Sequence, residues 1–228
     1  MIIGNGLIAS AFVNDYKEDD NFVIFAAGVS NSFETNISEF ERERNLLINT
    51  LSENKDKHFI YFSSFIDSNI LKRKYVEHKI NIEKVIKESK NNYTILKLPQ
   101  VIGRGGNNHE LVNFITTKLK QNEEISVYKN TYKSLIDVDD VKRIVDVLVK
   151  KWSDKNTYIE FPFIEKLLVH EIVDLIAKEL GVEPNIRFVE SDVNDFPEPS
   201  IIVEIILNHL GIIVEGYTEK VIKKYVNK

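Results

Sequence analysis

The chain is 228 residues long, with 43% hydrophobic residues, 29% charged residues and a formal net charge of −5. This length is sufficient for one α/β core with a small additional lobe, and this hydrophobic content is sufficient to bury that core. Because acidic and basic residues are interspersed, the charge pattern excludes a general nucleic-acid-binding surface. The sequence contains no cysteine, which excludes a disulfide framework, a thiolate metal site and a cysteine nucleophile.

The sequence also lacks the features of export and of membrane insertion. Its N-terminus has neither a basic flank nor the long apolar stretch of a signal peptide, and no window approaches the ~18 apolar residues that span a bilayer. The five histidines are scattered without the spacing of metal ligands, so we expect no metal site. A cytoplasmic protein that contacts neither membrane nor nucleic acid is the simplest expectation.

In chain order, strand-like and helix-like segments alternate, which is typical of a parallel sheet with helices on its faces. The elements expected up to residue 120 are strand 1–3, helix 7–16, strand 21–25, helix 38–52, strand 58–62, helix 75–89, strand 93–98 and helix 109–120. Those expected beyond are strands 124–128 and 134–137, helix 141–152, strand 156–161, helix 168–180, strand 185–189 and helices 200–210 and 217–226. This order predicts a Rossmann-like, doubly wound α/β fold with a small C-terminal lobe.

Three local patterns refine this prediction. In the helix at 38–52, alternating Glu and Arg residues indicate a solvent-exposed face. Asp140 precedes an amphipathic helix, where a carboxylate accepts free amides, so we expect it to be an N-cap. The glycine-rich segment 103–108 has the composition of a loop.

A glycine turn, Gly4-x-Gly6-x-x-Ala9, follows the apolar residues 1–3 and precedes a helix-compatible run. Glycines at these positions let the backbone turn tightly and approach a pyrophosphate at a helix N-terminus, where free amides and the helix dipole favour an anion. The same pattern also occurs in ordinary strand-to-helix turns, so by itself it leaves both interpretations open.

Tyr75 and Lys79 are four residues apart, so on a helix their side chains lie on one face. A nearby ammonium stabilises a phenolate and lowers the pKa of a tyrosine, which would let Tyr75 act as a general acid toward a ketone oxygen. This spacing is also ordinary on helix surfaces. Ser64, however, follows a buried strand, and ligands bind beyond the carboxyl ends of strands in open α/β sheets. A serine pair at such a place is otherwise a turn or a helix cap.

Together these stretches resemble the extended short-chain dehydrogenase/reductase superfamily, in particular the NAD-dependent epimerase/dehydratase group, which acts on nucleotide-activated sugars. The resemblance covers most of the first 141 residues through six collinear stretches, 3–9, 23–28, 61–64, 75–79, 96–103 and 133–141. The resemblance implies a cofactor-binding core at 1–103 and a substrate-binding lobe at 104–228, of which 129–162 partly returns to the core.

The resemblance also implies roles for individual residues. Ser64, Tyr75 and Lys79 would form the catalytic triad. The NAD(P)H cofactor would contact Gly4, Gly6, Leu7, Ile8, Ala26, Ala27, Gly28, Phe62, Ser63, Tyr75, Lys79, Pro99 and Val101. The nucleoside-diphosphate sugar would contact Ser64, Gln100, Asn113 and Lys133, the last at a position where the family often has an arginine.

One part of the family pattern is absent. In the family, a second and a third strand with their helix follow the glycine turn, and the second strand ends in an acid that binds the adenosine ribose. Here fifteen residues separate Gly6 from Phe22, which is room for one helix and a turn. We therefore expect a shortened sheet, an exposed adenosine and an exchangeable cofactor.

Three functions agree with these features: an NAD(P)H-dependent reductase of a nucleoside-diphosphate 4-keto-6-deoxy sugar in polysaccharide biosynthesis, a nucleotide-sugar epimerase, and a non-catalytic dinucleotide-binding sensor. Family 4,6-dehydratases carry an Asp-Glu pair where Ser64 is followed by Phe65 and Ile66, so dehydration is not expected. A reductase is favoured because it releases its cofactor in every cycle, whereas an epimerase retains it. In this family the helix that bears Tyr75 commonly packs against a partner subunit, which makes a homodimer one expectation.

Overall fold

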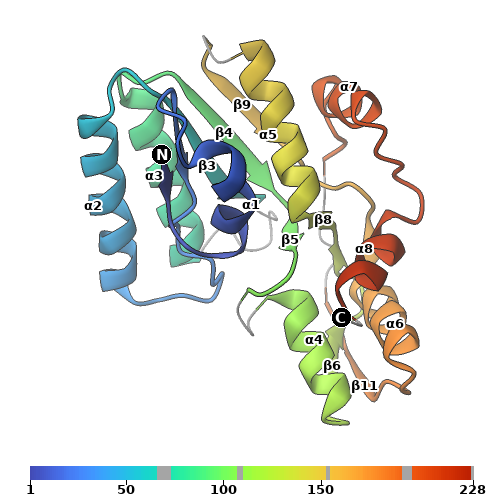
Figure 1. The fold of residues 1–228 in the computed structure, drawn as a ribbon. Coiled ribbons are helices and arrows are strands. Elements are labelled where there is room, and N and C mark those ends of the chain that lie inside the picture. The colour runs from blue at the N-terminus through green and yellow to red at the C-terminus, as the bar shows by residue number, and fades with distance from the viewer. Residues whose placement is uncertain (66–72, 107–109, 153–154, 192–196, 227–228) are drawn as a thin grey trace. The chain divides into compact units, whose positions relative to one another are not determined.

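The computed structural model describes residues 1–65, 73–106, 110–152, 155–191 and 197–226 (Figure 1). The end of the expected 103–108 loop and the expected helix start at His109 lie outside the described residues. Among the helices described, none is long and apolar enough to cross a membrane.

The chain divides into two compact units. The first consists of Met1–Leu98 and Asp139–Phe161, and the second of Pro99–Val138 and Pro162–Lys228. The chain therefore leaves the first unit, builds part of the second, and returns before it completes the second.

A five-stranded, wholly parallel sheet forms the centre of the first unit. Its strands, in spatial order, are β1 (Ile2–Ile3), β2 (Phe22–Phe25), β3 (His58–Ser64), β4 (Tyr93–Leu98) and β9 (Thr157–Glu160). This arrangement confirms the predicted parallel α/β fold. In the sheet, β1 pairs with β2 alone and is an edge strand, so the shortening expected from the short segment after Gly6 is confirmed.

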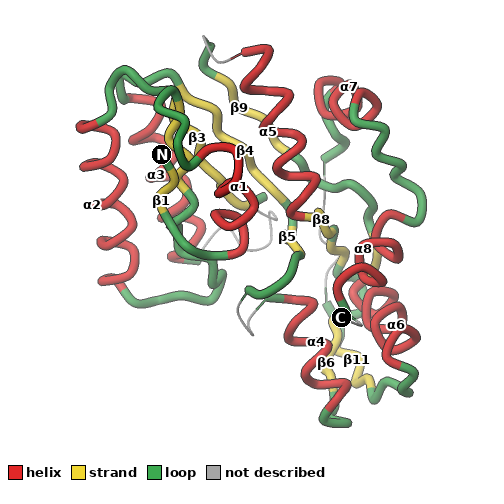
Figure 2. Tube along the Cα trace, in the orientation of Figure 1, coloured by secondary structure: helices red, strands yellow, loops and turns green. Residues whose placement is uncertain are grey.

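Among the residues that the structure describes, four helices cover this sheet (Figure 2). They are α1 (Leu7–Tyr16), α2 (Ile37–Glu53), α3 (Lys74–Glu88) and α5 (Val138–Trp152). The helix expected to begin at residue 141 begins three residues earlier, because β8 (Leu135–Asp137) runs directly into it.

The expectation that Asp140 is an N-cap was therefore wrong. Asp140 lies in the first turn of α5, where its carboxylate pairs with Arg143 at 2.6 Å. An acid in the first turn still interacts favourably with the helix dipole, so the residue type suits both positions and does not distinguish them.

Helices α2 and α3 pack on one face of the sheet. Phe25 and Tyr61 point toward this face from neighbouring strands and are completely buried in one cluster with Leu47 of α2 and Ile82 of α3. Burial of a large apolar side chain contributes about 1.5–3 kcal/mol, so this cluster is a main source of stability for the first unit.

Helices α1 and α5 pack on the opposite face. Phe62 is the next residue after Tyr61 in β3 and so points to the other side, where its ring centroid lies 5.5 Å from that of Phe12 in α1. The two helices also contact each other, because the Tyr16 hydroxyl donates a hydrogen bond to Asp146 of α5 over 2.7 Å. The sheet is therefore covered on both faces.

The connection through α1 has an unusual hand. The chain advances in one direction across the sheet from β1 to β2, β3 and β4, yet α1 lies on the face opposite to α2 and α3. Two crossovers that advance in the same direction with helices on opposite faces have opposite hands. Since about 98% of such crossovers are right-handed, β1–α1–β2 takes the rare left hand.

As a result of this hand, β1 and β2 lead to helices on opposite faces of the sheet. In Rossmann-like sheets the ligand crevice forms where neighbouring strands lead to helices on opposite faces, usually where the strand order reverses. Here the order does not reverse, but β1 leads to α1 on one face and β2 leads to α2 on the other. The shortened sheet thus retains the topology at which such crevices form, without a reversal of strand order.

The described part of the second unit contains three short strand pairs and four helices. Strand β5 (Gln100–Ile102) pairs with β8, β6 (Ile125–Tyr128) pairs with β11 (Ile186–Val189), and β7 (Tyr132–Lys133) pairs with β10 (Leu167–Leu168). The helices are α4 (Leu111–Lys120), α6 (Val169–Leu180), α7 (Ile201–His209) and α8 (Tyr217–Tyr225).

Gly4 permits the turn between β1 and α1. Its φ is +119°, and a Cβ at this position would lie 2.5 Å from the carbonyl oxygen of Ala26. We expect Gly4→Ala to lower the free energy of unfolding by about 2 kcal/mol or more, through backbone strain and displacement of β2. Gly6→Ala is the matched control, because Gly6 has a φ of −80° and open space at its Cβ position. Urea denaturation of both variants tests this, and equal stabilities would contradict it.

Candidate active site

Ser64 and Tyr75 are in direct contact. Ser64 is the last residue of β3, and Tyr75 lies in the first turn of α3. The serine Oγ and the tyrosine hydroxyl are 2.5 Å apart, the serine is half-buried, and the tyrosine is 4% exposed. The two hydroxyls expected to act together therefore meet at the carboxyl end of the central strand.

Lys79 lies one turn further along α3 and is 2% exposed. Its Nζ is 5.7 Å from the centroid of the Tyr75 ring. The ammonium donates hydrogen bonds to both carboxylate oxygens of Glu43, over 3.1 and 3.3 Å, and to the Tyr61 hydroxyl over 3.1 Å. The triad residues are thus neighbours, and the lysine is held by an anion from α2.

Glu43 is completely buried at the centre of this network. Besides Lys79, its carboxylate accepts hydrogen bonds from the Val29 amide at 2.7 Å and the Tyr61 hydroxyl at 2.8 Å, and it lies 2.9 Å from His78 Nε2. One carboxylate therefore connects α2 with α3, with β3 and with the loop after β2.

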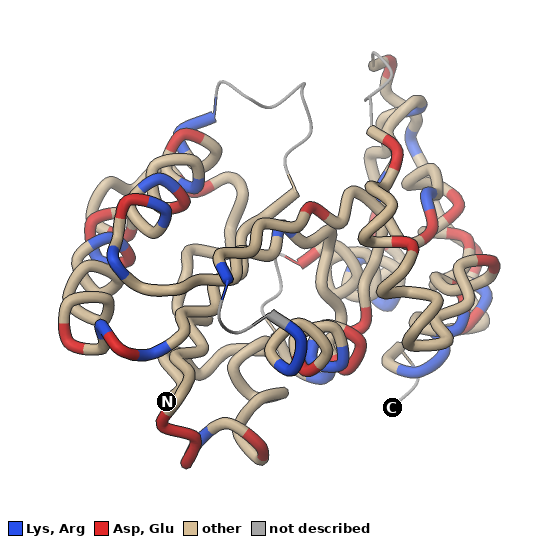
Figure 3. Tube along the Cα trace, turned by 90° about the horizontal axis from the view of Figure 1, so that it is seen from above, with Lys and Arg blue, Asp and Glu red and all other residues tan. Residues whose placement is uncertain are grey.

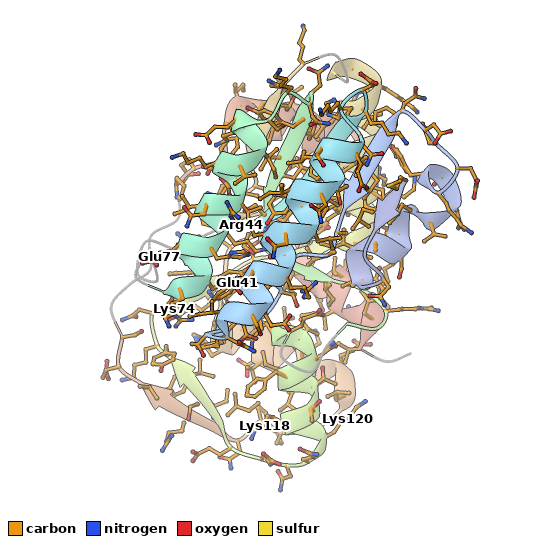
Figure 4. The ribbon with its side chains drawn as sticks, turned by 90° about the vertical axis from the view of Figure 1, so that its left-hand side faces the viewer. Glu41, Arg44, Lys74, Glu77, Lys118 and Lys120 are labelled. Atoms are coloured by element: carbon orange, nitrogen blue, oxygen red, sulfur yellow. The ribbon has the colours of Figure 1, made fainter. Side chains whose placement is uncertain are left out.

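The prediction that the charges of this helix mark an exposed face was wrong for Glu43. Figure 4 shows Glu41 and Arg44 on the outer side of α2, and Figure 3 shows both charge signs interleaved along this helix. Glu43 itself is three residues after Phe40 and four before the buried Leu47, which is the spacing of the inward face. That spacing was the signal that sequence analysis missed.

The surroundings of Glu43 favour its ionised form. Burial by itself raises the pKa of a carboxyl group, but the Lys79 ammonium and the hydrogen bonds from His78 and Val29 outweigh burial and lower the pKa of Glu43 to about 2. Burial and the adjacent Glu43 carboxylate raise the pKa of Tyr61 well above its ordinary value. At neutral pH Glu43 is therefore a carboxylate and Tyr61 a protonated phenol.

The glycine turn lies at the start of α1. Gly6 is the N-cap residue, and apart from its chain neighbours no atom of the described residues lies within 4 Å of a Cβ built on it, so the space at this Cβ position is open. Leu7 and Ile8 form the first turn of α1 and are half-buried. Gly4, by contrast, is required by the close approach of Ala26.

Residues Ala26, Ala27 and Gly28 connect the glycine turn to the triad. The Ala26 amide donates a hydrogen bond over 2.8 Å to the carbonyl oxygen of Ile3, the last residue of β1. At Gly28, a Cβ would lie 2.7 Å from Lys79 Nζ and 3.0 Å from Glu43 Oε1. The segment after β2 therefore touches the turn at one end and the lysine at the other.

The structure also locates Phe62 and Ser63, which were expected to contact a cofactor. The Phe62 ring packs toward α1, and the Ser63 hydroxyl donates to Glu83 of α3 over 2.6 Å. Both side chains are buried within the first unit. Any ligand contact with these two residues would therefore involve their backbone.

The remaining expected site residues belong to the second unit. Gln100 and Val101 are in β5, Lys133 is in β7, and Asn113 of α4 donates a side-chain hydrogen bond to the Gly105 carbonyl over 3.2 Å. Gln100, Val101 and Asn113 line one small pocket of this unit together with residues that include Gly103, Glu110 and Leu135. Pro99 is the first residue of the unit. Among the described residues of the whole chain, no cluster of three or more His, Asp or Glu side chains forms a metal-binding group.

The fold is that of the NAD-dependent nucleotide-sugar epimerases and dehydratases, in a shortened form. The chain is similar to the UDP-N-acetylglucosamine 4-epimerase from Bacillus cereus, with a TM-score of 0.73, 14% identity, and coverage of 99% of this chain and 94% of that one. It is similar to the UDP-glucose 4-epimerase of Thermus thermophilus, solved in complex with NAD, with a TM-score of 0.69, 12% identity, and coverage of 96% and 80%.

A dehydratase has the same fold. The chain is similar to the dTDP-glucose 4,6-dehydratase from Bacillus anthracis str. Ames, solved in complex with NAD, with a TM-score of 0.68, 14% identity, and coverage of 97% and 77%. No protein-family model and no curated protein matches the sequence. At these identities the likeness shows the fold, and the fold predicted from sequence is confirmed.

The buried carboxylate makes stability depend on acid pH. The pKa of Glu43 is about 2 in the folded protein, against an ordinary value of 4.5, so its stabilising contribution is fully present above pH 4.5 and is lost as the pH falls toward 2. This contribution amounts to about 3 kcal/mol. Glu43→Gln should cost about 3–5 kcal/mol at neutral pH, because Lys79 is left buried without an anion, and this cost should shrink below pH 4.5.

Urea denaturation at a series of pH values measures this difference. Glu41→Gln is the matched control, because this carboxylate is exposed on the same helix, and its removal should change stability by less than about 0.5 kcal/mol. A cost for Glu43→Gln that does not change with pH would contradict the assignment.

Proposed function

We propose that this protein is an NAD(P)H-dependent reductase that converts the ketone of a nucleoside-diphosphate 4-keto-6-deoxy sugar to an alcohol. The observation that carries this proposal is the contact of 2.5 Å between Ser64 and Tyr75 at the carboxyl end of β3, with Lys79 one turn away. Two hydroxyls in contact can both reach one carbonyl oxygen, which is the arrangement that general acid catalysis at a ketone requires.

The residues at the carboxyl edge of the first unit fit a dinucleotide. Open space at Gly6 lets a pyrophosphate approach the amides at the start of α1, where the helix dipole favours an anion. Gly28 has no side chain, so the Lys79 ammonium can occupy space that a Cβ at this position would take. From there the ammonium would lie beside a bound ribose. A reduced nicotinamide bound here would supply the hydride.

The chain itself supplies the proton. Tyr75 donates its hydroxyl proton to the substrate carbonyl oxygen as negative charge develops there, and Ser64 donates a hydrogen bond to the same oxygen. When the carbonyl oxygen approaches, the two hydroxyls exchange their mutual hydrogen bond for hydrogen bonds to that oxygen. Lys79 holds the ribose hydroxyls and so sets the position of the ring that reacts.

The fold and a pocket of the second unit support a nucleotide-sugar substrate. Solved structures with this fold include an epimerase in complex with UDP-N-acetylmuramic acid and a protein in complex with UDP-glucose. Gln100 and Asn113, which share a pocket, are the residues that we assign to the sugar nucleotide, together with Lys133. A lysine provides a point charge for a diphosphate.

The lack of cysteine agrees with a cytoplasmic enzyme, and a homodimer stays a prediction.

A nucleotide-sugar epimerase is the second candidate, favoured by the epimerases among the solved structures with this fold. The edge position of β1 supports the reductase instead, because the strand that normally carries the ribose-binding acid has no counterpart beside it in the described sheet. Loss of one charged hydrogen bond weakens binding by about one to two decades. Protein purified with a full complement of NAD would favour the epimerase, and a dinucleotide-binding protein without turnover would favour a sensor.

Replacement of the proton donor gives the direct test of the reaction. We expect Tyr75→Phe to lower the reduction rate by about 10²–10⁴-fold while NADH or NADPH affinity changes only a few-fold, because the phenol donates the proton and the ring is retained. Consumption of reduced nicotinamide with nucleoside-diphosphate 4-keto-6-deoxy sugars measures the rate. Tyr158→Phe is the matched control, since that hydroxyl lies on β9 and donates to Glu160. Near-normal turnover of Tyr75→Phe would remove Tyr75 from the mechanism.

A branched side chain at the helix N-terminus tests the dinucleotide site. Gly6→Val should weaken NADH and NADPH binding by about tenfold or more, because it fills the space that a pyrophosphate needs, while the open surroundings and the φ of −80° let the protein fold. Asn14→Val places the same side chain on the exposed surface of α1 as a control. Calorimetric titration gives the affinities, and an unchanged affinity for Gly6→Val would contradict the cofactor assignment.

A further inference from the structure

The carboxylate of Glu43 is the anionic partner of Lys79. Glu43 is completely buried, Lys79 is 2% exposed, and among the described residues no other carboxylate lies within ion-pair distance of this lysine. A lysine side chain has four rotatable bonds and carries about 2 kcal/mol of rotamer entropy, so the place of its ammonium depends on what holds it. Here two groups hold it, the Glu43 carboxylate and the Tyr61 hydroxyl.

The same carboxylate also holds the backbone that the ammonium faces. Its Oε2 accepts the Val29 amide over 2.7 Å, directly after Gly28, and Gly28 is the residue whose Cβ would lie 2.7 Å from Lys79 Nζ. Glu43 therefore positions both the Lys79 ammonium and the backbone at Gly28 and Val29 that faces it. A shift of this carboxylate would move the lysine and the loop after β2 together.

We propose that Glu43 is a positioning residue that holds the Lys79 ammonium beneath Gly28, in the place where it meets the ribose hydroxyls of a nicotinamide dinucleotide. This rests on the proposed function, because the ribose is its assumed ligand. One N–H of the Lys79 ammonium can donate a bifurcated hydrogen bond to both carboxylate oxygens of Glu43. Another N–H of the ammonium is then available to the ribose. The negative charge also compensates the lysine, so the cost of burying that ammonium is met before the cofactor binds.

Glu83 provides a comparison within the same unit. It is 5% exposed, lies on α3 and accepts a hydrogen bond from the Ser63 hydroxyl, as Glu43 accepts one from Tyr61. Its lysine partner is Lys87, at 4.0 Å and 40% exposed, rather than Lys79. Replacement of Glu83 by Gln therefore removes a buried carboxylate of the same unit that is not paired with Lys79.

A double-mutant cycle separates positioning from general stability. NADH affinity is measured by fluorescence titration for the parent protein, Glu43→Gln, Lys79→Met and the double variant, with circular dichroism as the check on folding. If Glu43 acts through Lys79, Glu43→Gln weakens NADH binding about tenfold in the parent but changes it by less than about twofold in the Lys79→Met background. Glu83→Gln should change the affinity by less than about twofold in both backgrounds.

The outcomes distinguish failure of this inference from failure of the proposed function. An equal weakening by Glu43→Gln in both backgrounds, or none in the parent, overturns the positioning role while NADH binding by the parent still supports the function. No binding of NADH or NADPH by the parent overturns the proposed function and this inference with it. If Glu43→Gln does not fold, Glu43→Asp replaces it in the cycle, because it keeps the charge but draws it away from Lys79, and unchanged affinity in that variant overturns the inference.

Discussion

The arrangement of the candidate site depends on one buried carboxylate, that of Glu43. Glu43 belongs to α2. Its carboxylate accepts hydrogen bonds from the Val29 amide, the Tyr61 hydroxyl and the Lys79 ammonium, and it lies within hydrogen-bond distance of His78. A buried charge is tolerated only when it is paired and hydrogen-bonded, so these partners cannot separate without a cost of several kcal/mol. Consequently the loop after β2, the central strand β3 and the helix α3 are held in one mutual geometry. The contact of Ser64 with Tyr75 lies at the end of that same strand and the start of that same helix.

A second constraint is the short connection between β1 and β2. It has room for one helix, so β2 must be placed beside β1, and α1 stays on the face opposite to α2. The resulting left-handed crossover is rare, since it works against the preferred twist of strands. It nevertheless leaves β1 and β2 leading to helices on opposite faces, with Gly6 after β1 and Gly28 after β2. The part of the fold that supports the proposed dinucleotide site is therefore retained, while the sheet beyond β1 is shortened.

The sequence was informative where the relevant rules are local. Ser64 follows an apolar strand, and Tyr75 and Lys79 share one helix face, as strand and helix geometry predict, whereas their grouping as one triad was implied by the family resemblance. The sequence was misleading where one residue type is common in two different local structures. Asp140 has the chemistry of an N-cap and of a first-turn acid, and only the extent of β8 decided between them. Glu43 stands in a charged run that indicates an exposed face, although its spacing from Phe40 and Leu47 belongs to the buried one.

By itself, the sequence determined the parallel α/β fold, the shortened connection after the glycine turn and the order of the candidate site residues, because hydrophobic periodicity and chain length act over neighbouring residues. Only the tertiary structure decided that α1 lies on the face opposite to α2, and that the Lys79 ammonium is bound by a carboxylate thirty-six residues before it in the chain. Both depend on which distant segments pack together. Which segments pack together depends on the total free energy of burying and pairing side chains across the whole unit, so it cannot be read from any single stretch of the sequence.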